Sequence, residues 1–174
     1  MPARERLIDE LRSHALVVGE VVLTSGQVAE YYVDAKRAIL RPAGFRALSE
    51  LVAGHAEQMG ATAVGGLTMG ADAPACAALA GGADVKAFFV RKETKAHGLQ
   101  RRIEGPDVTG RRVLALEDTS TTGSSVLTAV DALREAGAEV AGVAVVVDRG
   151  AGDAIRAAGL AYRAAYDLVD LGLV

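Results

Sequence analysis

Two adjacent carboxylates followed by a run of hydroxyl-bearing residues form the part of the sequence best suited to chemistry. The stretch reads VLALEDTSTTGSS over residues 113–125, so an apolar segment leads into Glu117 and Asp118 and then into a turn with one glycine. A carboxylate can accept hydrogen bonds from two neighbouring hydroxyl groups. A turn rich in Thr, Ser and Gly at a helix start offers backbone N–H groups and a partial positive charge to a phosphate. Together the two halves fit a phosphorylated ribose.

The same stretch also fits a strand end followed by an ordinary helix cap, since Ser and Thr cap helices without any ligand. We favour a ligand because the acidic pair and five candidate cradle residues occur together. The cradle residues are Thr121, Thr122, Gly123, Ser124 and Ser125. The sequence has no GxxxxGK[ST] motif, and GGLTMG at residues 65–70 lacks the middle glycine of GxGxxG. Nucleoside-triphosphate and dinucleotide motifs are therefore absent.

A second candidate segment is strongly basic. Residues 91–102, RKETKAHGLQRR, hold five of the 19 lysines and arginines of a chain whose net charge is -3. The segment has few apolar residues and contains Gly98, so we expect a mobile, solvated loop. Such a loop can be merely a charged surface segment. Near a phosphate cradle, however, its cations could neutralise a departing pyrophosphate.

The elements that position these segments follow from apolar periodicity. Short apolar runs, which we interpret as strands, alternate with helical patterns. The strands are expected at residues 61–65, 85–90, 112–116, 140–147 and 160–164, and the helices at 3–14, 42–59, 71–80, 125–136 and 153–158. A hairpin is expected from the runs at 21–23 and 31–33. This alternation indicates an α/β fold with a parallel sheet covered on both faces. Sites in such sheets lie at the carboxyl ends of the strands.

Several of these segments resemble one enzyme superfamily. Residues 113–125 resemble the signature with which type I phosphoribosyltransferases bind 5-phospho-α-D-ribosyl 1-diphosphate (PRPP). RKETKAHG at 91–98 resembles the catalytic loop of orotate phosphoribosyltransferase, which is not expected in purine or uracil phosphoribosyltransferases. TSGQVAEYYVD at 24–34 resembles the orotate-site segment of that family, and VGGLTMGAD at 64–72 lies where the family has its pyrophosphate loop.

The resemblance implies the type I phosphoribosyltransferase fold, with a central, mostly parallel sheet flanked by helices and a small N-terminal helix and hairpin hood. We expect one domain over residues 1–174, with residues 1–40 forming the hood and contributing to the base site. The implied reaction joins orotate and PRPP to give orotidine 5'-monophosphate and pyrophosphate. A phosphoribosyltransferase for a purine or another pyrimidine, or a PRPP-sensing regulator, remains an alternative.

The resemblance also implies roles for individual residues. Catalytic and PRPP-binding roles in the loop fall to Arg91, Lys92, Lys95 and His97. The other PRPP-binding residues are Glu117, Asp118, Thr119, Ser120, Thr121, Thr122, Gly123, Ser124 and Ser125. Orotate would contact Thr121 and Arg149, and the pyrophosphate loop would comprise Thr68, Met69 and Gly70. Some relatives carry lysine at the positions of Thr24 and Met69.

The implied cofactor is Mg²⁺, held mainly by PRPP and water, which suits an ion that dehydrates reluctantly. In the family the enzyme is a homodimer, so the resemblance implies that the 91–105 loop is shared across the interface.

Composition narrows the remaining classes. A pI near 5.6 argues against general nucleic-acid binding, which needs a basic surface. The single cysteine, Cys76, excludes an intrachain disulfide, and no apolar stretch has the length of a signal peptide or a membrane span. We therefore expect a cytoplasmic enzyme without a nucleic-acid or membrane partner.

Overall fold

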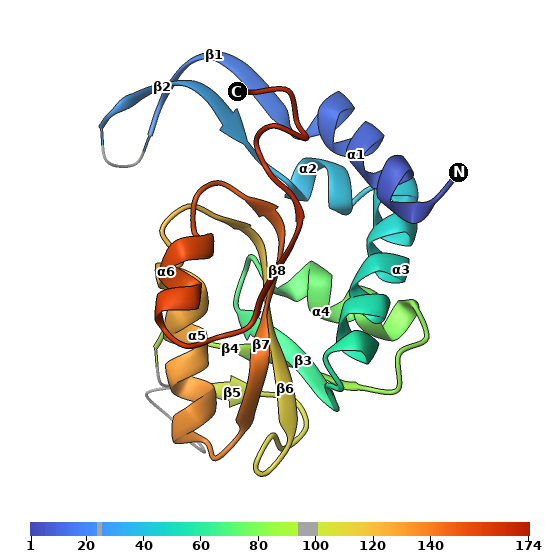
Figure 1. Ribbon diagram of the computed structural model, residues 1–174, viewed down its shortest axis with the longest axis vertical. Coiled ribbons are helices and arrows are strands. Elements are labelled where there is room, and N and C mark those ends of the chain that lie inside the picture. The colour runs from blue at the N-terminus through green and yellow to red at the C-terminus, as the bar shows by residue number, and fades with distance from the viewer. Residues whose placement is uncertain (24–25, 94–100) are drawn as a thin grey trace.

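The computed structural model describes residues 1–23, 26–93 and 101–174. Within these ranges the strands of the main sheet lie in the order β5-β4-β3-β6-β7-β8 (Figure 1). Their bounds are β3 Ala63–Leu67, β4 Lys86–Val90, β5 Ile103–Glu104, β6 Arg112–Ser120, β7 Glu139–Asp148 and β8 Tyr162–Tyr166. The neighbouring pairs are parallel except that β5 is antiparallel to β4. The predicted mostly parallel sheet is confirmed.

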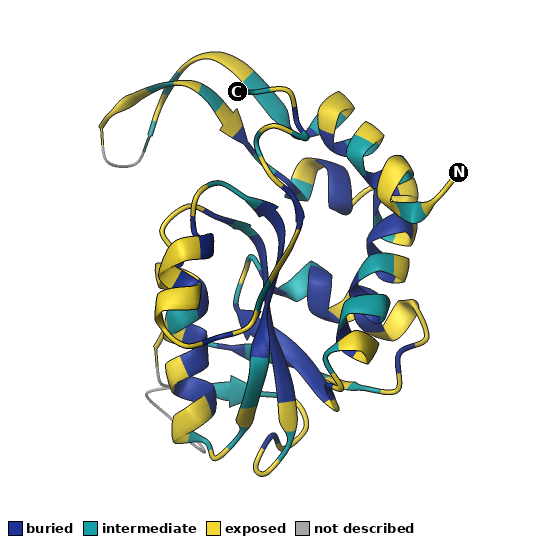
Figure 2. Cartoon of the chain, viewed as in Figure 1, coloured by how far each residue is buried: buried dark blue, intermediate teal, exposed yellow. Residues whose placement is uncertain are grey.

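Helices cover both faces of this sheet. One layer comprises α1 (Ala3–His14), α2 (Lys36–Ile39), α3 (Pro42–Gln58) and α4 (Asp72–Ala80). The other layer comprises α5 (Ser124–Glu135) and α6 (Gly152–Ala157). Figure 2 shows the strands buried between helices whose outer faces are exposed.

The alternation of side chains along β6 explains why both layers form. Leu114 and Leu116 pack into the core cluster shared with α1, α3 and α4. Val113 and Ala115 point to the other face and pack with residues of α5 and α6. Because successive side chains of a strand point to opposite faces, a continuous apolar run is buried on both sides.

The N-terminal region forms a separate hairpin that lies over the carboxyl ends of the main strands (Figure 1). Strand β1 (Leu16–Val22) pairs antiparallel with β2 (Val28–Val33), with a register irregularity between Val18 and Val21. Helix α1 anchors this hood, because its Leu7 and Leu11 are fully buried. The predicted helix at residues 3–14 and the hairpin are confirmed.

Two elements were not predicted from the sequence. Strand β5 contributes only two residue pairs, Phe89–Glu104 and Val90–Ile103, which is too short to produce a recognisable alternation. Helix α2 has four residues, two of which, Ala38 and Ile39, are fully buried. None of the helices in the described ranges combines the length and the apolar character that a membrane crossing requires.

Two glycines of α3 provide a matched test of this packing. A Cβ atom at Gly44 would overlap the carbonyl oxygen of Ala38, so Gly44→Ala must push α2 away from α3. We expect the free energy of unfolding to fall by about 1–3 kcal/mol. At Gly54 nothing lies within 4 Å of the Cβ position. There the alanine should raise the free energy of unfolding by about 0.5–1 kcal/mol through helix propensity.

Urea denaturation followed by circular dichroism measures both changes. A Gly44→Ala variant as stable as Gly54→Ala would contradict the close contact between α2 and α3.

Candidate active site

The acidic pair lies inside β6 rather than after it. The strand continues to Ser120, four residues beyond the predicted end, so Glu117 and Asp118 remain in the sheet. Glu117 is 5% exposed and Asp118 is 3% exposed. Burying two neighbouring carboxyl groups is costly unless each finds a partner or a proton. Their surroundings therefore decide what the site can bind.

The two carboxyl groups converge beside Gly70, although adjacent strand residues start out on opposite faces. A Cβ atom at Gly70 would overlap Glu117 Oε1 and would lie 2.7 Å from Asp118 Oδ1. Any residue other than glycine would collide with the pair. The predicted pyrophosphate loop, Thr68–Gly70, thus packs directly against the acidic pair.

The loop that contains Gly70 is held by Asp72. Thr68 Oγ1 donates a hydrogen bond of 2.8 Å to Asp72 Oδ2. Met69 is 70% exposed, so its uncharged side chain faces solvent rather than the core. The backbone of this loop, rather than a charged side chain, is therefore what residues 68–70 present to an anion.

Lys36, which the sequence analysis missed, neutralises Asp118. Its Nζ atom lies 2.6 Å from Asp118 Oδ2. Burial disfavours the charged lysine, but the hydrogen bond and charge of Asp118, with further contributions from Asp34 and Glu117, raise the pKa of Lys36 above its usual value. The lysine is therefore a permanent cation in the site at neutral pH.

Glu117 binds its proton more tightly than an ordinary glutamate does. Burial, the hydrogen bond with Asp118 and the charge of Asp118 together raise the pKa of Glu117 to about 8. The backbone N–H of Asp118 also donates to Glu117 Oε1, at 3.2 Å. Asp118, which pairs with Lys36, is therefore the carboxyl group better placed to accept hydrogen bonds from hydroxyl groups.

The hydroxyl-rich turn follows directly after β6. Gly123 has φ +81° and lets the chain turn into α5, whose first residue is Ser124. The hydroxyl groups of Thr122 and Ser124 lie 3.0 Å apart. The cradle residues other than Gly123 are exposed, whereas Ser120 is buried within the strand. Because the first backbone N–H groups of a helix have no partner within it, this turn can bind a phosphate.

Arg149 connects the sheet to the hood. Its backbone N–H donates to the carbonyl of Ser120 at 2.8 Å, which places it beside the end of β6. Its guanidinium lies over the rings of Tyr31 and Tyr32, 5.8 and 5.9 Å from their centroids. Its buried Nε atom has no hydrogen-bond partner within the part of the chain that the structure describes. This cation is available to an anionic ligand.

Two of the four predicted loop residues can be placed. Arg91 Nε lies 2.7 Å from Glu104 Oε1, and its backbone N–H donates to the carbonyl of Arg102. Lys92 is exposed. Lys95 and His97, with the rest of residues 94–100, lie outside the described residues, as does Thr24.

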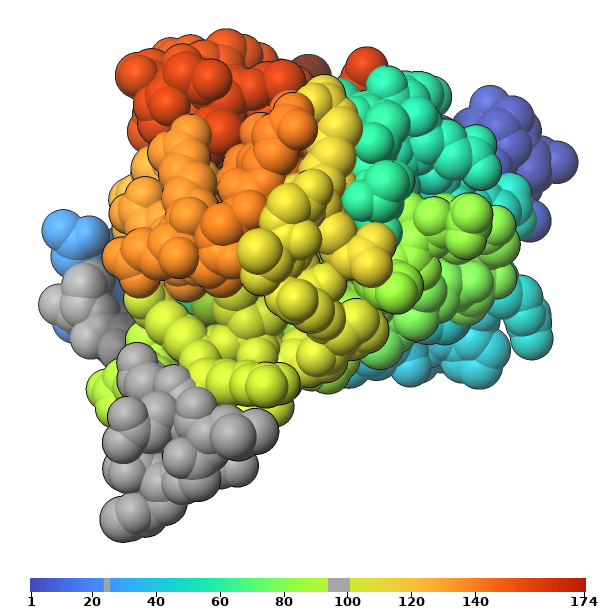
Figure 3. Space-filling view, turned by 90° about the horizontal axis from the view of Figure 1, so that it is seen from below, coloured from blue at the N-terminus to red at the C-terminus, as the bar shows by residue number. Residues whose placement is uncertain are grey.

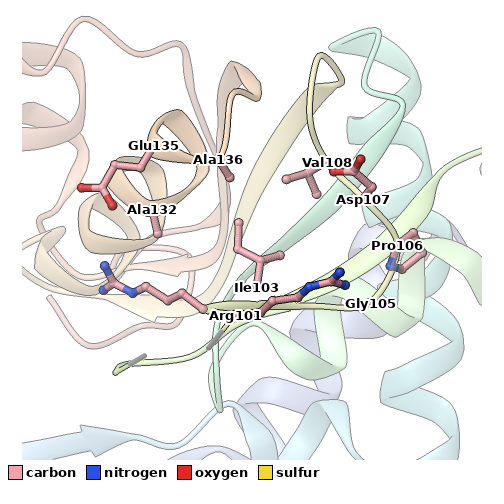
Figure 4. A pocket seen from close by; sticks show the side chains of 10 residues that line it. Arg101, Ile103, Gly105, Pro106, Asp107, Val108, Ala132, Glu135 and Ala136 are labelled. Atoms are coloured by element: carbon pink, nitrogen blue, oxygen red, sulfur yellow. The ribbon is translucent and has the colours of Figure 1, made fainter. Parts of the chain in front are cut away.

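A cavity of about 460 Å³ lies away from this cluster (Figure 4). It is bounded by the 101–108 segment and by Ala132, Glu135 and Ala136 around the C-terminal end of α5. That end lies towards the amino ends of the strands, on the face shown in Figure 3. Across the described ranges, no three His, Cys, Asp or Glu side chains are placed to hold a metal ion.

Known proteins are similar to the chain over nearly all of its length. The family model "Phosphoribosyl transferase domain" matches residues 38–157. The orotate phosphoribosyltransferase of Corynebacterium glutamicum (strain R) is 54% identical over 174 residues, which cover 98% of this chain and 95% of that protein.

Solved structures agree with this relationship. The Mycobacterium tuberculosis orotate phosphoribosyltransferase in complex with Fe(III) dicitrate has a TM-score of 0.90 and 49% sequence identity. The same enzyme in complex with PRPP has a TM-score of 0.86 and 46% identity. Both comparisons cover 99% of this chain and 100% of the solved chain.

The proton on Glu117 predicts a pH-dependent stability. The usual pKa of a glutamate is 4.5, whereas in the fold it is about 8. Between these values the unfolded chain has lost a proton that the folded chain keeps, so the free energy of unfolding falls as pH rises. We expect wild type to lose stability relative to Glu117→Gln from about pH 5 to about pH 8, by on the order of 1 kcal/mol or more.

Urea denaturation across this pH range measures the difference between the two proteins. Glu20→Gln, which alters an exposed carboxyl of β1, is the control and should run parallel to wild type. Parallel curves for Glu117→Gln as well would show that Glu117 is ionised in the fold.

Proposed function

The chain belongs to the phosphoribosyltransferase family, as an orotate phosphoribosyltransferase, and from this premise we propose how its residues carry out the reaction. The enzyme transfers the phosphoribosyl group of PRPP to orotate, giving orotidine 5'-monophosphate and pyrophosphate, in pyrimidine biosynthesis. The comparisons do not favour a purine phosphoribosyltransferase or a PRPP-sensing regulator. The structural observation that carries the assignment concerns the carboxyl ends of the neighbouring parallel strands β3 and β6. There the Gly70 loop packs against the acidic pair, and β6 leads into the turn before α5.

PRPP binds across the acidic pair, the turn before α5 and the Gly70 loop. The ionised Asp118 accepts hydrogen bonds from the ribose hydroxyl groups, and the protonated Glu117 completes the contact. The 5'-phosphate binds the turn of Thr121, Thr122, Gly123, Ser124 and Ser125, where the helix N-terminus supplies N–H donors. The pyrophosphate then lies over Thr68–Gly70, whose backbone packs against the acidic pair.

Orotate binds between the hood and the end of β7. Arg149 meets the orotate carboxylate, because a guanidinium fork matches a carboxylate with two parallel hydrogen bonds. Its position over Tyr31 and Tyr32 supports this role, since the rings hold the guanidinium in place while its Nε–H stays without a partner in the described part of the chain. Thr121, next to the end of β6, contributes the second predicted contact. Residues 1–40 thereby take part in base binding.

The chemical step separates charge. Pyrophosphate departs from the anomeric carbon as a cationic centre forms there, so the site must neutralise the leaving group and exclude water. We assign the neutralisation to Arg91, Lys92, Lys95 and His97, and the exclusion of water to closure of the 91–105 loop over the site. The ion pair between Arg91 and Glu104 joins the two ends of that loop to each other.

Mg²⁺ fits this site through the substrate rather than through protein ligands. Asp118 is already bonded to Lys36, and Glu117 keeps its proton, so the pair offers little to a bare cation. PRPP oxygens and water would hold the ion, with any contribution of the acidic pair made through bound water. When bound, Mg²⁺ neutralises negative charge on the leaving pyrophosphate.

We further propose a homodimer in which the loop of one protomer acts in the active site of the other. The support is the resemblance of RKETKAHG to the shared catalytic loop of this family. Lys95 and His97 would then serve the partner's substrate.

The activity itself is the first prediction. With purified protein, PRPP and Mg²⁺, we expect the orotate absorbance to fall with stoichiometric release of pyrophosphate. Uracil, hypoxanthine and adenine, assayed in parallel by product chromatography, should not react. Removal of Mg²⁺ by a chelator should abolish turnover, and added Mg²⁺ should restore it.

Each outcome discriminates. Turnover of another base alone would overturn the orotate assignment. Undiminished turnover in chelator would remove Mg²⁺ from the mechanism.

Complementation tests the shared loop. Lys95→Ala and Asp118→Asn should each be inactive as homodimers, because one lacks the loop cation and the other lacks the ribose carboxylate. Mixed under subunit exchange, the two should regain part of the activity, since one site of each mixed dimer is then intact. As the control, a dimer of Arg91→Ala with Lys95→Ala has a defective loop in each protomer, so neither site is intact and the mixture should restore nothing. Failure of the first mixture to recover activity would mean that the loop acts within its own protomer.

A further inference from the structure

Lys36 comes from the hood side of the molecule but ends in the acidic pair. It is the first residue of α2, 82 positions away from Asp118 in the sequence. Its side chain is 35% exposed, whereas that of Asp118 is 5% exposed. The ammonium therefore lies at the boundary between the buried pair and the open side of the site.

The backbone that carries Lys36 is firmly placed. Ala38 and Ile39 of the same helix are fully buried, and Gly44 packs against the carbonyl of Ala38. A lysine on such a short, anchored helix is not free to range over the surface. Its position beside Asp118 is a property of the packed hood.

One carboxylate joins Lys36 to the pyrophosphate loop. Asp118 Oδ2 pairs with Lys36, and Asp118 Oδ1 faces Gly70. The loop has no cationic side chain of its own, since its central residue is the exposed Met69. Lys36 brings a positive charge to that place from another part of the chain.

We propose that Lys36 binds the pyrophosphate group of PRPP, bridging it to Asp118, an assignment that rests on the proposed function. An ammonium has three N–H donors, so one can remain on Asp118 while the others contact phosphate oxygens. Because Asp118 is negative and faces the same loop, the polyanionic pyrophosphate needs a cation between them. The Lys36 ammonium fills that role where the loop offers only backbone.

Binding measurements without orotate test the contact directly. Isothermal titration of Lys36→Gln should show PRPP and inorganic pyrophosphate binding weakened about 10- to 100-fold, as expected for a lost charge-assisted hydrogen bond. Ribose 5-phosphate, which lacks pyrophosphate, should change less than about threefold. Lys36→Arg should recover most of the affinity. Arg37→Gln, which removes an exposed charge from the same helix, should bind as wild type does.

A purely structural role gives a different pattern. If Lys36 only holds Asp118 in position, ribose 5-phosphate and PRPP should weaken by the same factor, and pyrophosphate affinity should not change. That result would overturn the proposal.

Lysine labelling of the wild-type protein covers the case in which Lys36→Gln does not fold. The chain has four lysines, at positions 36, 86, 92 and 95, so acetylation can be followed at each by mass spectrometry. Pyrophosphate should protect Lys36 and leave the exposed Lys86 of β4 unchanged. Equal labelling of Lys36 with and without pyrophosphate would contradict the contact. Because neither measurement uses orotate, a wild-type enzyme inactive on orotate would refute the function and leave this test intact.

Discussion

Two carboxyl groups buried side by side in the central strand of a sheet form the constraint on which the rest of this structure depends. Both cannot be charged in a dry interior without compensation, because desolvation and mutual repulsion disfavour that state. The protein satisfies this constraint in two ways. The pKa of Glu117 is raised, which favours its neutral form, and the ammonium of Lys36 pairs with Asp118. Gly70 follows from it as well, since the backbone can approach the pair only where no side chain intervenes.

This compensation also suits an anionic substrate. A doubly charged pair would repel the phosphates of PRPP across a medium that screens poorly. With one charge retained and paired, the strand presents an acceptor for hydroxyl groups next to donors for phosphate. The parallel sheet makes the combination possible, because the ends of β6 and β7 bring the turn before α5 and Arg149 to the same edge.

Local patterns predicted the elements that are buried on both faces, because only an apolar run can occupy such a strand. They failed where function departs from that rule. The predicted strand stopped at residue 116 since Glu117 and Asp118 have the composition of a strand end, yet β6 continues through Ser120. A buried charge in the middle of a strand costs free energy. The rule that such strands are apolar fails at Glu117 and Asp118, where the carboxyl groups serve binding.

Local sequence patterns could not predict the contacts between segments that are distant in the chain. The resemblance identified the 24–34 segment and Arg149 separately. That Tyr31 and Tyr32 of this segment contact the guanidinium of Arg149 is seen only once the hairpin is packed in the fold. No sequence pattern identified Lys36 as a site residue, because a lysine at the start of a four-residue helix is typical of any solvated surface. Lys36 differs from a surface lysine because Ala38 and Ile39 of the same helix are buried, which fixes α2 in a position where the Lys36 side chain reaches Asp118. The hood therefore completes the electrostatics of the sheet as well as covering it, so a change that loosens α2 should disturb the charge of the acidic pair before it disturbs the strands.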